Sequence, residues 1–347
     1  MDDRLQFDPD GVGVDNGNYF GFPFEEEDAR LVLLSVPWDV TASYGGGAAF
    51  GPDAIIEAST QLDFYDPFAP GAWRRGIATA AIDYSVQDRS SRLRPDARKV
   101  IERLEEGGNL LEDYLMPRRL ERVNTASEEL NREVYEASRQ RLDAGRLVGL
   151  VGGDHSTPLG LIRAVAEREP GVSILHLDAH CDLREAYEGF TYSHASIMYN
   201  VLQEAPGVAR IVQVGQRDYS ARERELALTS PRVELFDDHL LCGRRFGGES
   251  WTAICDAIVE RLPEKVYVSF DIDVLSVEYC PSTGTPVAGG LSFNEAVWLV
   301  DRVAASGRRI VGFDLCEVAP GKESTIDASV GARVLFKLCG AILKTNE

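Results

Sequence analysis

The chain alternates between short apolar runs and longer segments in which apolar residues recur at helical spacing. Eight runs have the length of buried strands, at 31–36, 77–82, 147–152, 172–178, 210–215, 233–237, 265–271 and 309–315. Polar residues interrupt these runs too rarely for one face to meet solvent, which is typical of strands buried on both faces. Strands that alternate with helices indicate a parallel sheet with helices on both sides. We therefore predict an α/β fold with a mostly parallel sheet.

Helix starts are marked at several places by residues that satisfy free backbone groups. Residues 52–60 begin with a proline at the first helical position and an aspartate in the first turn. Thr125 and Glu128 have the spacing of a capping box, and so do Ser292 and Glu295. We expect helices to begin at these three points.

Two segments lack a regular pattern. Residues 1–29 are rich in Gly, Asp and Asn and carry several aromatics, so we expect an N-terminal arm that lies on the body or on a neighbouring subunit. Residues 105–122 are also irregular and are interpreted as an insertion. No repeat or low-complexity linker divides the remainder, so residues 30–347 are predicted to form a single domain.

Composition narrows the classes of partner. The net charge is −20, from 56 acidic and 36 basic residues, which argues against nucleic acid and anionic membranes as partners. The six cysteines are scattered without a C-x-x-C pair, so neither a zinc knuckle nor a disulfide scaffold is indicated. No apolar stretch reaches the length of a membrane span. We expect a cytoplasmic protein with reduced thiols.

Imidazole and carboxylate side chains gather where the predicted strands end. They are His155, Asp178, His180, Asp182, Asp271, Asp273 and Glu317, with His194 further along the loop that contains His180. In open parallel sheets, ligands bind beyond the carboxyl ends of the strands. We therefore expect these side chains to face one site.

Divalent cations explain this concentration of negative charge. Two carboxylates about 4 Å apart repel by about 4 kcal/mol at an effective dielectric of 20, and Arg184 is the only basic residue in 176–187. Imidazole with carboxylate suits Mn, Ni, Fe or Zn. Six candidate ligands, four of them carboxylates, exceed the needs of one ion, so the sequence predicts two metals bridged by shared carboxylates. Alternation within Asp178, His180 and Asp182 places these three on one face of an extended segment.

Five motifs resemble those of the ureohydrolases, the arginase–agmatinase family. They are GGDHS at 152–156, LDAHCDLRE at 177–185, SFDIDVLS at 269–276, STGTPVAGGLSFNEA at 282–296 and DLCEV around Glu317. The resemblance spans nearly the whole chain. It implies a three-layer α/β/α sandwich around an eight-stranded, mostly parallel sheet, with residues 30–347 as the catalytic domain. Trimers or hexamers are common in the family.

The resemblance also implies roles for individual residues. One metal is expected on His155, Asp178, Asp182 and Asp271, and the other on His180, Asp178, Asp271 and Asp273. Asp178 and Asp271 would bridge two ions, either Mn²⁺ or Ni²⁺. A hydroxide between the ions would attack the guanidinium carbon, releasing urea and an amine or ammonia.

Three further residues match family positions around the substrate. His194 matches the proton-shuttle histidine, for which a neutral-range pKa is expected. Glu317 matches the glutamate that pairs with the guanidinium, and Thr285 is expected to add a hydrogen bond. Cys181, Cys280 and Cys316 lie near these motifs, and a cysteine nucleophile of the deiminase or amidine-transfer type is the alternative to structural packing.

The choice of guanidino substrate depends on departures from the arginase pattern. Arginases carry an asparagine where Arg184 stands, which argues against arginine and favours the agmatinase branch. Residues 16–24 and 36–47 resemble microbial guanidine hydrolases, which prefer nickel. Trp38, Tyr44 and Tyr19 or Phe20 are expected to wall off the pocket, and a closed pocket would reject a charged tail.

Free guanidine is therefore the favoured substrate, with agmatine and guanidinobutyrate as alternatives. The competing interpretation of the aromatics is that they pack the arm onto the body. Two alternatives are more distant. One is a catalytically idle binding protein on the same fold, and the other is a deacetylase-like enzyme with one zinc ion. They are opposed by the complete set of ligands.

Overall fold

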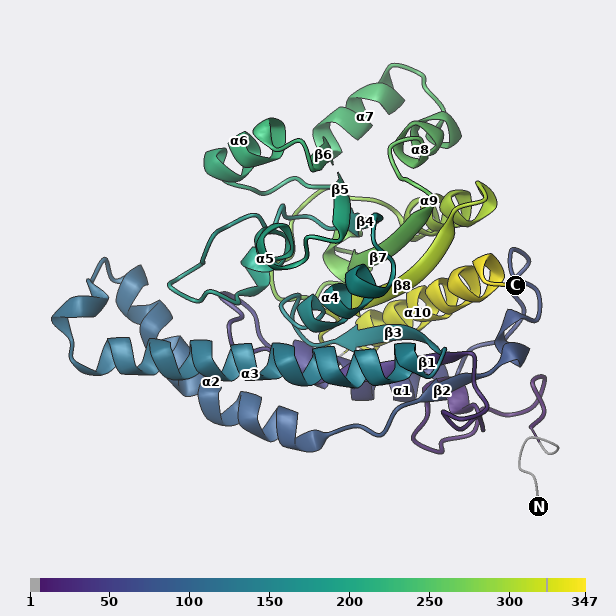
Figure 1. Ribbon diagram of the computed structural model, residues 1–347, viewed down its shortest axis with the longest axis horizontal. Coiled ribbons are helices and arrows are strands. Elements are labelled where there is room, and N and C mark those ends of the chain that lie inside the picture. The colour runs from purple at the N-terminus through teal and green to yellow at the C-terminus, as the bar shows by residue number, and fades with distance from the viewer. Residues whose placement is uncertain (1–6, 323) are drawn as a thin grey trace.

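The central element is an all-parallel sheet of eight strands, seen edge-on within the helices in Figure 1. The computed structural model describes residues 7–322 and 324–347. The strands are β1 (Leu31–Val36), β2 (Ile77–Thr79), β3 (Leu147–Gly152), β4 (Val172–Leu177), β5 (Val208–Val214), β6 (Val233–Phe236), β7 (Lys265–Asp271) and β8 (Arg309–Cys316). Their order is β2-β1-β3-β8-β7-β4-β5-β6, and every pair is parallel. Each predicted strand is present, although several end a few residues from the expected position.

Helices cover both faces of the sheet. One face packs against α1 (Gly51–Ser59), α7 (Asp238–Phe246), α8 (Trp251–Val259), α9 (Phe293–Ala305) and α10 (Ile326–Thr345). The other packs against α2 (Tyr84–Glu105), α3 (Leu115–Asp143), α4 (Leu159–Arg168), α5 (Ile197–Glu204) and α6 (Ala221–Thr229). Within β1, Leu31 and Leu33 belong to the first core and Val32 and Leu34 to the second, because successive side chains alternate between faces. The predicted three-layer sandwich is confirmed.

Two of the three predicted helix starts are correct. Helix α1 begins at Gly51, one residue before the predicted start. At the start of α9, Ser292 Oγ accepts the Glu295 N–H at 3.3 Å, and Glu295 Oε2 accepts the Ser292 N–H at 2.9 Å. The box predicted at Thr125 and Glu128 is wrong, because both residues lie inside α3.

The reason for that error is a hydrophobic stripe that starts earlier than expected. Val123, Ala126, Leu130 and Val134 are buried at helical spacing and continue one face of α3 through the predicted start. Much of the segment predicted as an insertion, 105–122, is therefore helical. Helices α2 and α3 lie side by side and extend from the body at the left of Figure 1.

The described part of the N-terminal segment packs onto the body of its own chain. Tyr19, Phe20 and Phe22 are fully buried. The Tyr19 hydroxyl lies 2.7 Å from Ser35 Oγ, and the Phe20 ring lies 5.4 Å from the ring of Phe336 in α10. These aromatics anchor the segment on the α1 and α10 side of the sheet.

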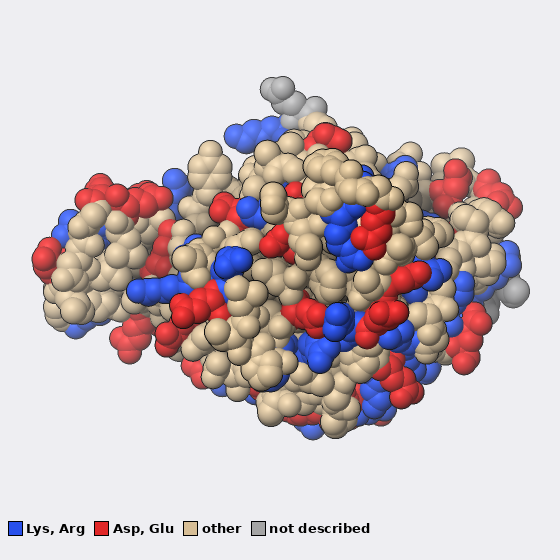
Figure 2. All heavy atoms as spheres, turned by 90° about the horizontal axis from the view of Figure 1, so that it is seen from above, with Lys and Arg blue, Asp and Glu red and all other residues tan. Residues whose placement is uncertain are grey.

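On the face shown in Figure 2, acidic and basic side chains are interspersed, so the negative net charge is not gathered into one patch there. Among the described helices, none combines the length and the apolar character that crossing a bilayer requires.

Candidate metal centre

The predicted site residues follow four strands that are neighbours in the middle of the sheet. These strands are β3, β8, β7 and β4. His155 lies in the loop after β3, Glu317 directly after β8, and Asp178 directly after β4, while Asp271 ends β7. Because all four strands run the same way, their carboxyl ends deliver these side chains to one edge of the sheet.

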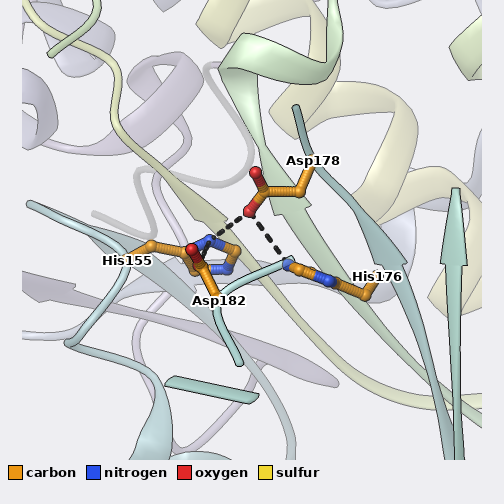
Figure 3. Close-up of side chains that lie close together, drawn as sticks. All are labelled: His155, His176, Asp178 and Asp182. Carbon is orange, nitrogen blue, oxygen red and sulfur yellow. Dashed lines mark hydrogen bonds and ion pairs between the residues drawn. The ribbon is translucent and has the colours of Figure 1, made fainter. Parts of the chain in front are cut away.

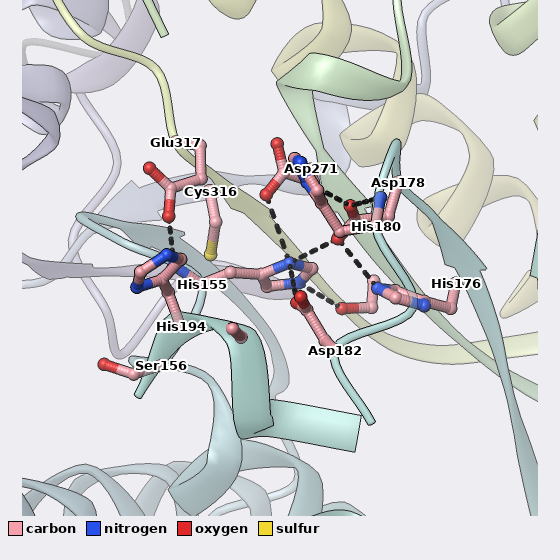
Figure 4. Close-up of polar contacts among 12 residues, drawn as sticks. His155, Ser156, His176, Asp178, His180, Asp182, His194, Asp271, Cys316 and Glu317 are labelled. Carbon is pink, nitrogen blue, oxygen red and sulfur yellow. Dashed lines mark hydrogen bonds and ion pairs between the residues drawn. The ribbon is translucent and has the colours of Figure 1, made fainter. Parts of the chain in front are cut away.

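The first group of side chains converges on His155 (Figure 4). Its Nδ1 atom lies 2.8 Å from Asp178 Oδ2. The same nitrogen lies 3.4 Å from Asp182 Oδ2 and 3.2 Å from Asp271 Oδ2. All four side chains are buried. Three carboxylates thus face one imidazole nitrogen, which is the set that the family resemblance assigned to one metal.

The second group converges on His180. Its Nδ1 atom lies 3.1 Å from Asp273 Oδ2 and 3.4 Å from Asp178 Oδ1. The two oxygens of Asp178 therefore face different imidazoles, and this carboxylate connects the two groups. Asp271 joins them as well, because its Oδ1 accepts the Asp273 N–H at 2.8 Å.

The chemistry of these donors fits divalent cations better than protons alone. Burial, followed by the charges of Asp273 and Asp178, raises the pKa of Asp271 well above its usual value. Burial and the charge of Asp178 raise the pKa of Asp182 to about 6. The buried Asp273 Oδ2 atom accepts no hydrogen bond in the described part of the chain. Cations would relieve this repulsion, and imidazole with carboxylate is a donor set that Mn²⁺ and Ni²⁺ accept.

Backbone strain accompanies two of the site residues. Asp182 and Glu317 have φ angles of 53° and 62°, in the left-handed region that non-glycine residues rarely adopt. Such a conformation costs on the order of 1–3 kcal/mol and persists where surrounding contacts hold it. The Asp182 carbonyl accepts the N–H groups of Met198 and Tyr199, both at 3.1 Å, and the Glu317 carbonyl accepts the Thr283 hydroxyl at 2.9 Å. The fold thus holds both carboxylates in place at an energetic cost.

His176 is a site residue to which the sequence analysis gave no role (Figure 3). It is fully buried in β4, and its Nε2 lies 2.9 Å from Asp178 Oδ2. The Gln213 amide nitrogen lies 2.6 Å from the Cys181 carbonyl and 3.0 Å from His176 Nδ1, so the amide donates to both. Nδ1 is then an acceptor, and Nε2 carries the hydrogen that is donated to Asp178. His176 therefore orients the shared carboxylate instead of binding metal; its position two residues before Asp178 on the same strand face was the available signal.

Replacing His176 with Phe is expected to weaken metal binding about 10- to 100-fold, the usual size for a residue that orients a ligand. The ring would still fill the space, but Asp178 would lose a hydrogen bond. Competition between metal-stripped protein and a fluorescent chelator measures the affinity. His239→Phe, at an exposed position of α7, is the matched control. Equal affinity of the His176 variant and the wild type would contradict this role.

A cavity of about 290 Å³ reaches one ligand of each group, Asp182 of the first and His180 of the second. His180, Asp182 and His194 line it, together with Tyr44 and Thr285. The predicted substrate contacts of Tyr44, Thr285 and His194 are therefore brought to one cavity.

Glu317 lies buried beside the metal ligands instead of in the cavity wall. One carboxylate oxygen accepts the His155 N–H at 2.9 Å, and the other has no partner in the described part of the chain. Burial, followed by the charge of Asp154, raises the pKa of Glu317 well above its usual value. A guanidinium ion would supply the missing counter-charge.

The environment of His194 differs from the neutral-range pKa expected from the sequence. Burial, followed by the positive charges of His180 and Arg94, lowers its pKa to about 3. Its Nε2 atom lies 3.4 Å from Ser43 Oγ, and its ring meets the Tyr187 ring edge-on. The imidazole is thus neutral at physiological pH before substrate enters.

The aromatic wall predicted around the substrate is not present. Trp38 is fully buried in the core, with the Arg89 guanidinium 5.6 Å from its ring, and it does not line the cavity. Tyr19 and Phe20 are buried on the opposite face of the sheet. Of these predicted aromatics only Tyr44 lines the cavity, where 86% of it is exposed to solvent. Trp38, Tyr19 and Phe20 therefore serve packing, which was the competing interpretation, and they do not close the cavity.

The cysteines near the motifs are not activated nucleophiles. Cys181, Cys280 and Cys316 are buried, and burial raises the pKa of each thiol. A catalytic thiolate requires the opposite shift. The packing interpretation is therefore favoured for all three.

Comparison with known proteins adds an independent line of observation. The sequence model described as "Arginase family" matches residues 29–340. A relative named N(1)-aminopropylagmatine ureohydrolase, from Thermococcus kodakarensis, is 34% identical over 93% of this chain and 94% of its own. A relative from Bacillus anthracis named agmatinase is 27% identical over 88% and 89%. The agmatine ureohydrolase structure from Thermoplasma volcanium superposes with a TM-score of 0.68 at 22% identity, over 93% and 92% of the two chains, and so shares the fold.

Proposed function

Because the chain belongs to the arginase family, we propose that it hydrolyses a guanidino compound with an aminoalkyl tail, of the agmatine type, to urea and an amine. The observation that carries the proposal is the pair of imidazole nitrogens, on His155 and His180, that face carboxylates connected through Asp178. A cavity reaches this arrangement at His180 and Asp182, which both line it.

Free guanidine, favoured from the sequence, is no longer the best candidate. That preference depended on the resemblance of residues 16–24 and 36–47 to guanidine hydrolases and on aromatics closing the pocket, and Trp38 lies in the core instead. A cavity of about 290 Å³ offers more room than a free guanidinium ion needs. The relatives' names refer to substrates that carry an amine tail. These three observations support the agmatinase-type alternative.

The residues fit two divalent metals. One would be held by His155, Asp178, Asp182 and Asp271, and the other by His180, Asp178, Asp271 and Asp273. When bound, such cations supply Lewis acidity that lowers the pKa of water to about 7. Mn²⁺ and Ni²⁺ both suit this donor set.

The chain's own side chains bind the substrate and move the proton. The free oxygen of Glu317 accepts hydrogen bonds from the guanidinium, a charge-assisted contact that fixes the orientation of the planar group. Thr285, expected to add a hydrogen bond to the substrate, lines the cavity. His194, neutral before substrate enters, would accept the proton that the attacking water gives up and pass it to the leaving nitrogen as the carbon–nitrogen bond breaks, so that the amine departs neutral. Assembly as a trimer or hexamer and a cytoplasmic location stay predictions from the sequence.

The test is urea release from a panel of guanidino compounds. Protein loaded with Mn²⁺ or with Ni²⁺ is given agmatine, N1-aminopropylagmatine, 4-guanidinobutyrate, arginine and guanidine at equal low concentrations. We expect kcat/KM to be highest for agmatine or its aminopropyl derivative, because both carry an ammonium tail. A higher kcat/KM for guanidine, or for a compound with a carboxylate tail, would overturn the proposal.

A further inference from the structure

The outer part of the cavity carries charges that the proposed chemistry does not use. Beyond the imidazoles and Asp182, the charged side chains of its wall are Arg184, Asp218 and Glu223. Because they share this cavity with His180 and Asp182, these groups are within the space that the tail of a bound guanidino compound would occupy. Their state of pairing therefore decides which tail the cavity accepts.

Arg184 and Glu223 compensate each other. Arg184 Nε lies 3.5 Å from Glu223 Oε2, and its guanidinium stacks on the Tyr187 ring at 4.6 Å. Glu223 is buried and also serves the start of α6, where its Oε2 accepts the Ser220 N–H at 2.9 Å. Its Oε1 accepts the Leu183 N–H at 3.3 Å. Arg184 is thus held in place and is not free to bind a carboxylate.

Asp218 differs from both because its carboxylate makes no hydrogen bond or ion pair with any other described residue. It is exposed. Its backbone forms a parallel bridge with that of His180, so the two backbones lie about 4.8 Å apart. Asp218 therefore lies one strand spacing from the proposed metal ligand His180 and lines the same cavity.

The wall that contains Asp218 and His180 also carries apolar side chains. Pro286 and Val287 follow Thr285 in the cavity wall. Tyr187 also lines the cavity, and its ring meets the His194 ring edge-on. Methylene groups of a tail would be removed from water against these side chains, which stabilises a bound alkyl chain.

We propose that Asp218 binds the ammonium group of the substrate tail and makes the cavity select ammonium-tailed over carboxylate-tailed guanidino compounds. The inference rests on the proposed function and goes further by naming the residue that reads the tail. An ammonium gains a charge-assisted hydrogen bond at this point. A carboxylate tail meets repulsion from Asp218 and finds Arg184 already paired.

Charge changes at position 218 test the assignment. Asp218→Asn is expected to lower kcat/KM for agmatine about tenfold, mainly through KM, the size of one charge-assisted contact near solvent. The loss for guanidine, which has no tail, is expected to be several-fold smaller. Asp218→Lys is expected to raise the ratio of kcat/KM for 4-guanidinobutyrate to that for agmatine by about 100-fold, because the sign of the tail contact reverses. Glu225→Gln, an exposed acid on α6 outside the cavity, is the matched control.

Equal losses for agmatine, 4-guanidinobutyrate and guanidine in Asp218→Asn would mean that Asp218 acts on structure, and the inference would be wrong while urea release still supported the proposed function. Calorimetric binding of agmatine to the metal-loaded wild type and to Asp218→Asn requires no turnover. About tenfold weaker binding in the variant supports the inference even if the wild type releases no urea. Equal affinities overturn it.

Discussion

Replacing Asp178 with Asn is expected to reduce urea release about 10²- to 10³-fold, the size of loss for one preorganised electrostatic group. Asp178 connects the two groups of ligands, because its oxygens face His155 and His180 separately. Asparagine keeps the shape and can still accept hydrogen bonds, but it removes the negative charge that two cations would share. Metal content, measured by plasma mass spectrometry, is expected to fall below two per chain.

The same substitution also affects the metal-free protein. Although burial opposes ionisation, the neighbouring His176 and the hydrogen bonds from His155 and His180 lower the pKa of Asp178 well below its usual value, so the ionised carboxylate stabilises the fold. Removing this charge is therefore expected to lower the melting temperature measured in EDTA at neutral pH and to reduce the further rise on adding metal. Asp256→Asn, which removes a surface carboxylate paired with Arg302, controls for general effects of the change. Wild-type activity with two metals in the Asp178 variant would contradict the assignment of a shared ligand.

Replacing Glu317 with Gln is expected to lower kcat/KM for agmatine about 10- to 100-fold, mostly through KM, because a hydrogen bond to a charged group contributes about 1.5–3 kcal/mol. The amide oxygen can still accept the His155 N–H, so the backbone around position 317 is expected to hold its left-handed conformation. What is lost is the counter-charge for the guanidinium. Steady-state kinetics and the metal content of the same preparation measure the two effects separately.

Unchanged metal content with a raised KM is the result that assigns Glu317 to substrate binding. A loss of metal at unchanged KM would show that the residue serves the metal centre instead. Glu225→Gln again provides the matched charge change outside the site.

The sheet and most of the site were predictable because both follow from position along strands. In a parallel sheet, a residue just after a buried strand is delivered to the ligand-binding edge whatever the packing above it. Asp178, Asp271 and Glu317 all occupy such positions. The ligand grouping itself came from the family resemblance.

The errors arose where tertiary packing decides. Thr125 and Glu128 satisfy a local rule, yet the apolar stripe of α3 extends past them, and packing outweighs the cap signal. Trp38 follows β1 closely, but the sequence does not tell whether a loop aromatic turns toward the cavity or the core. His176 was missed because its role depends on Gln213, which lies on another strand. Asp218 could not be singled out from the sequence either, because its role follows from the pairing of Arg184 with Glu223, which only the structure shows.

The most direct test of a two-metal ureohydrolase is a metal titration. Metal-stripped protein is titrated with Mn²⁺, and separately with Ni²⁺, while urea release from agmatine is followed. Bound metal is counted in the same samples. We expect no urea without metal and maximal release at two ions per chain. Maximal release at one ion per chain, or urea release from the fully stripped protein, would contradict the account.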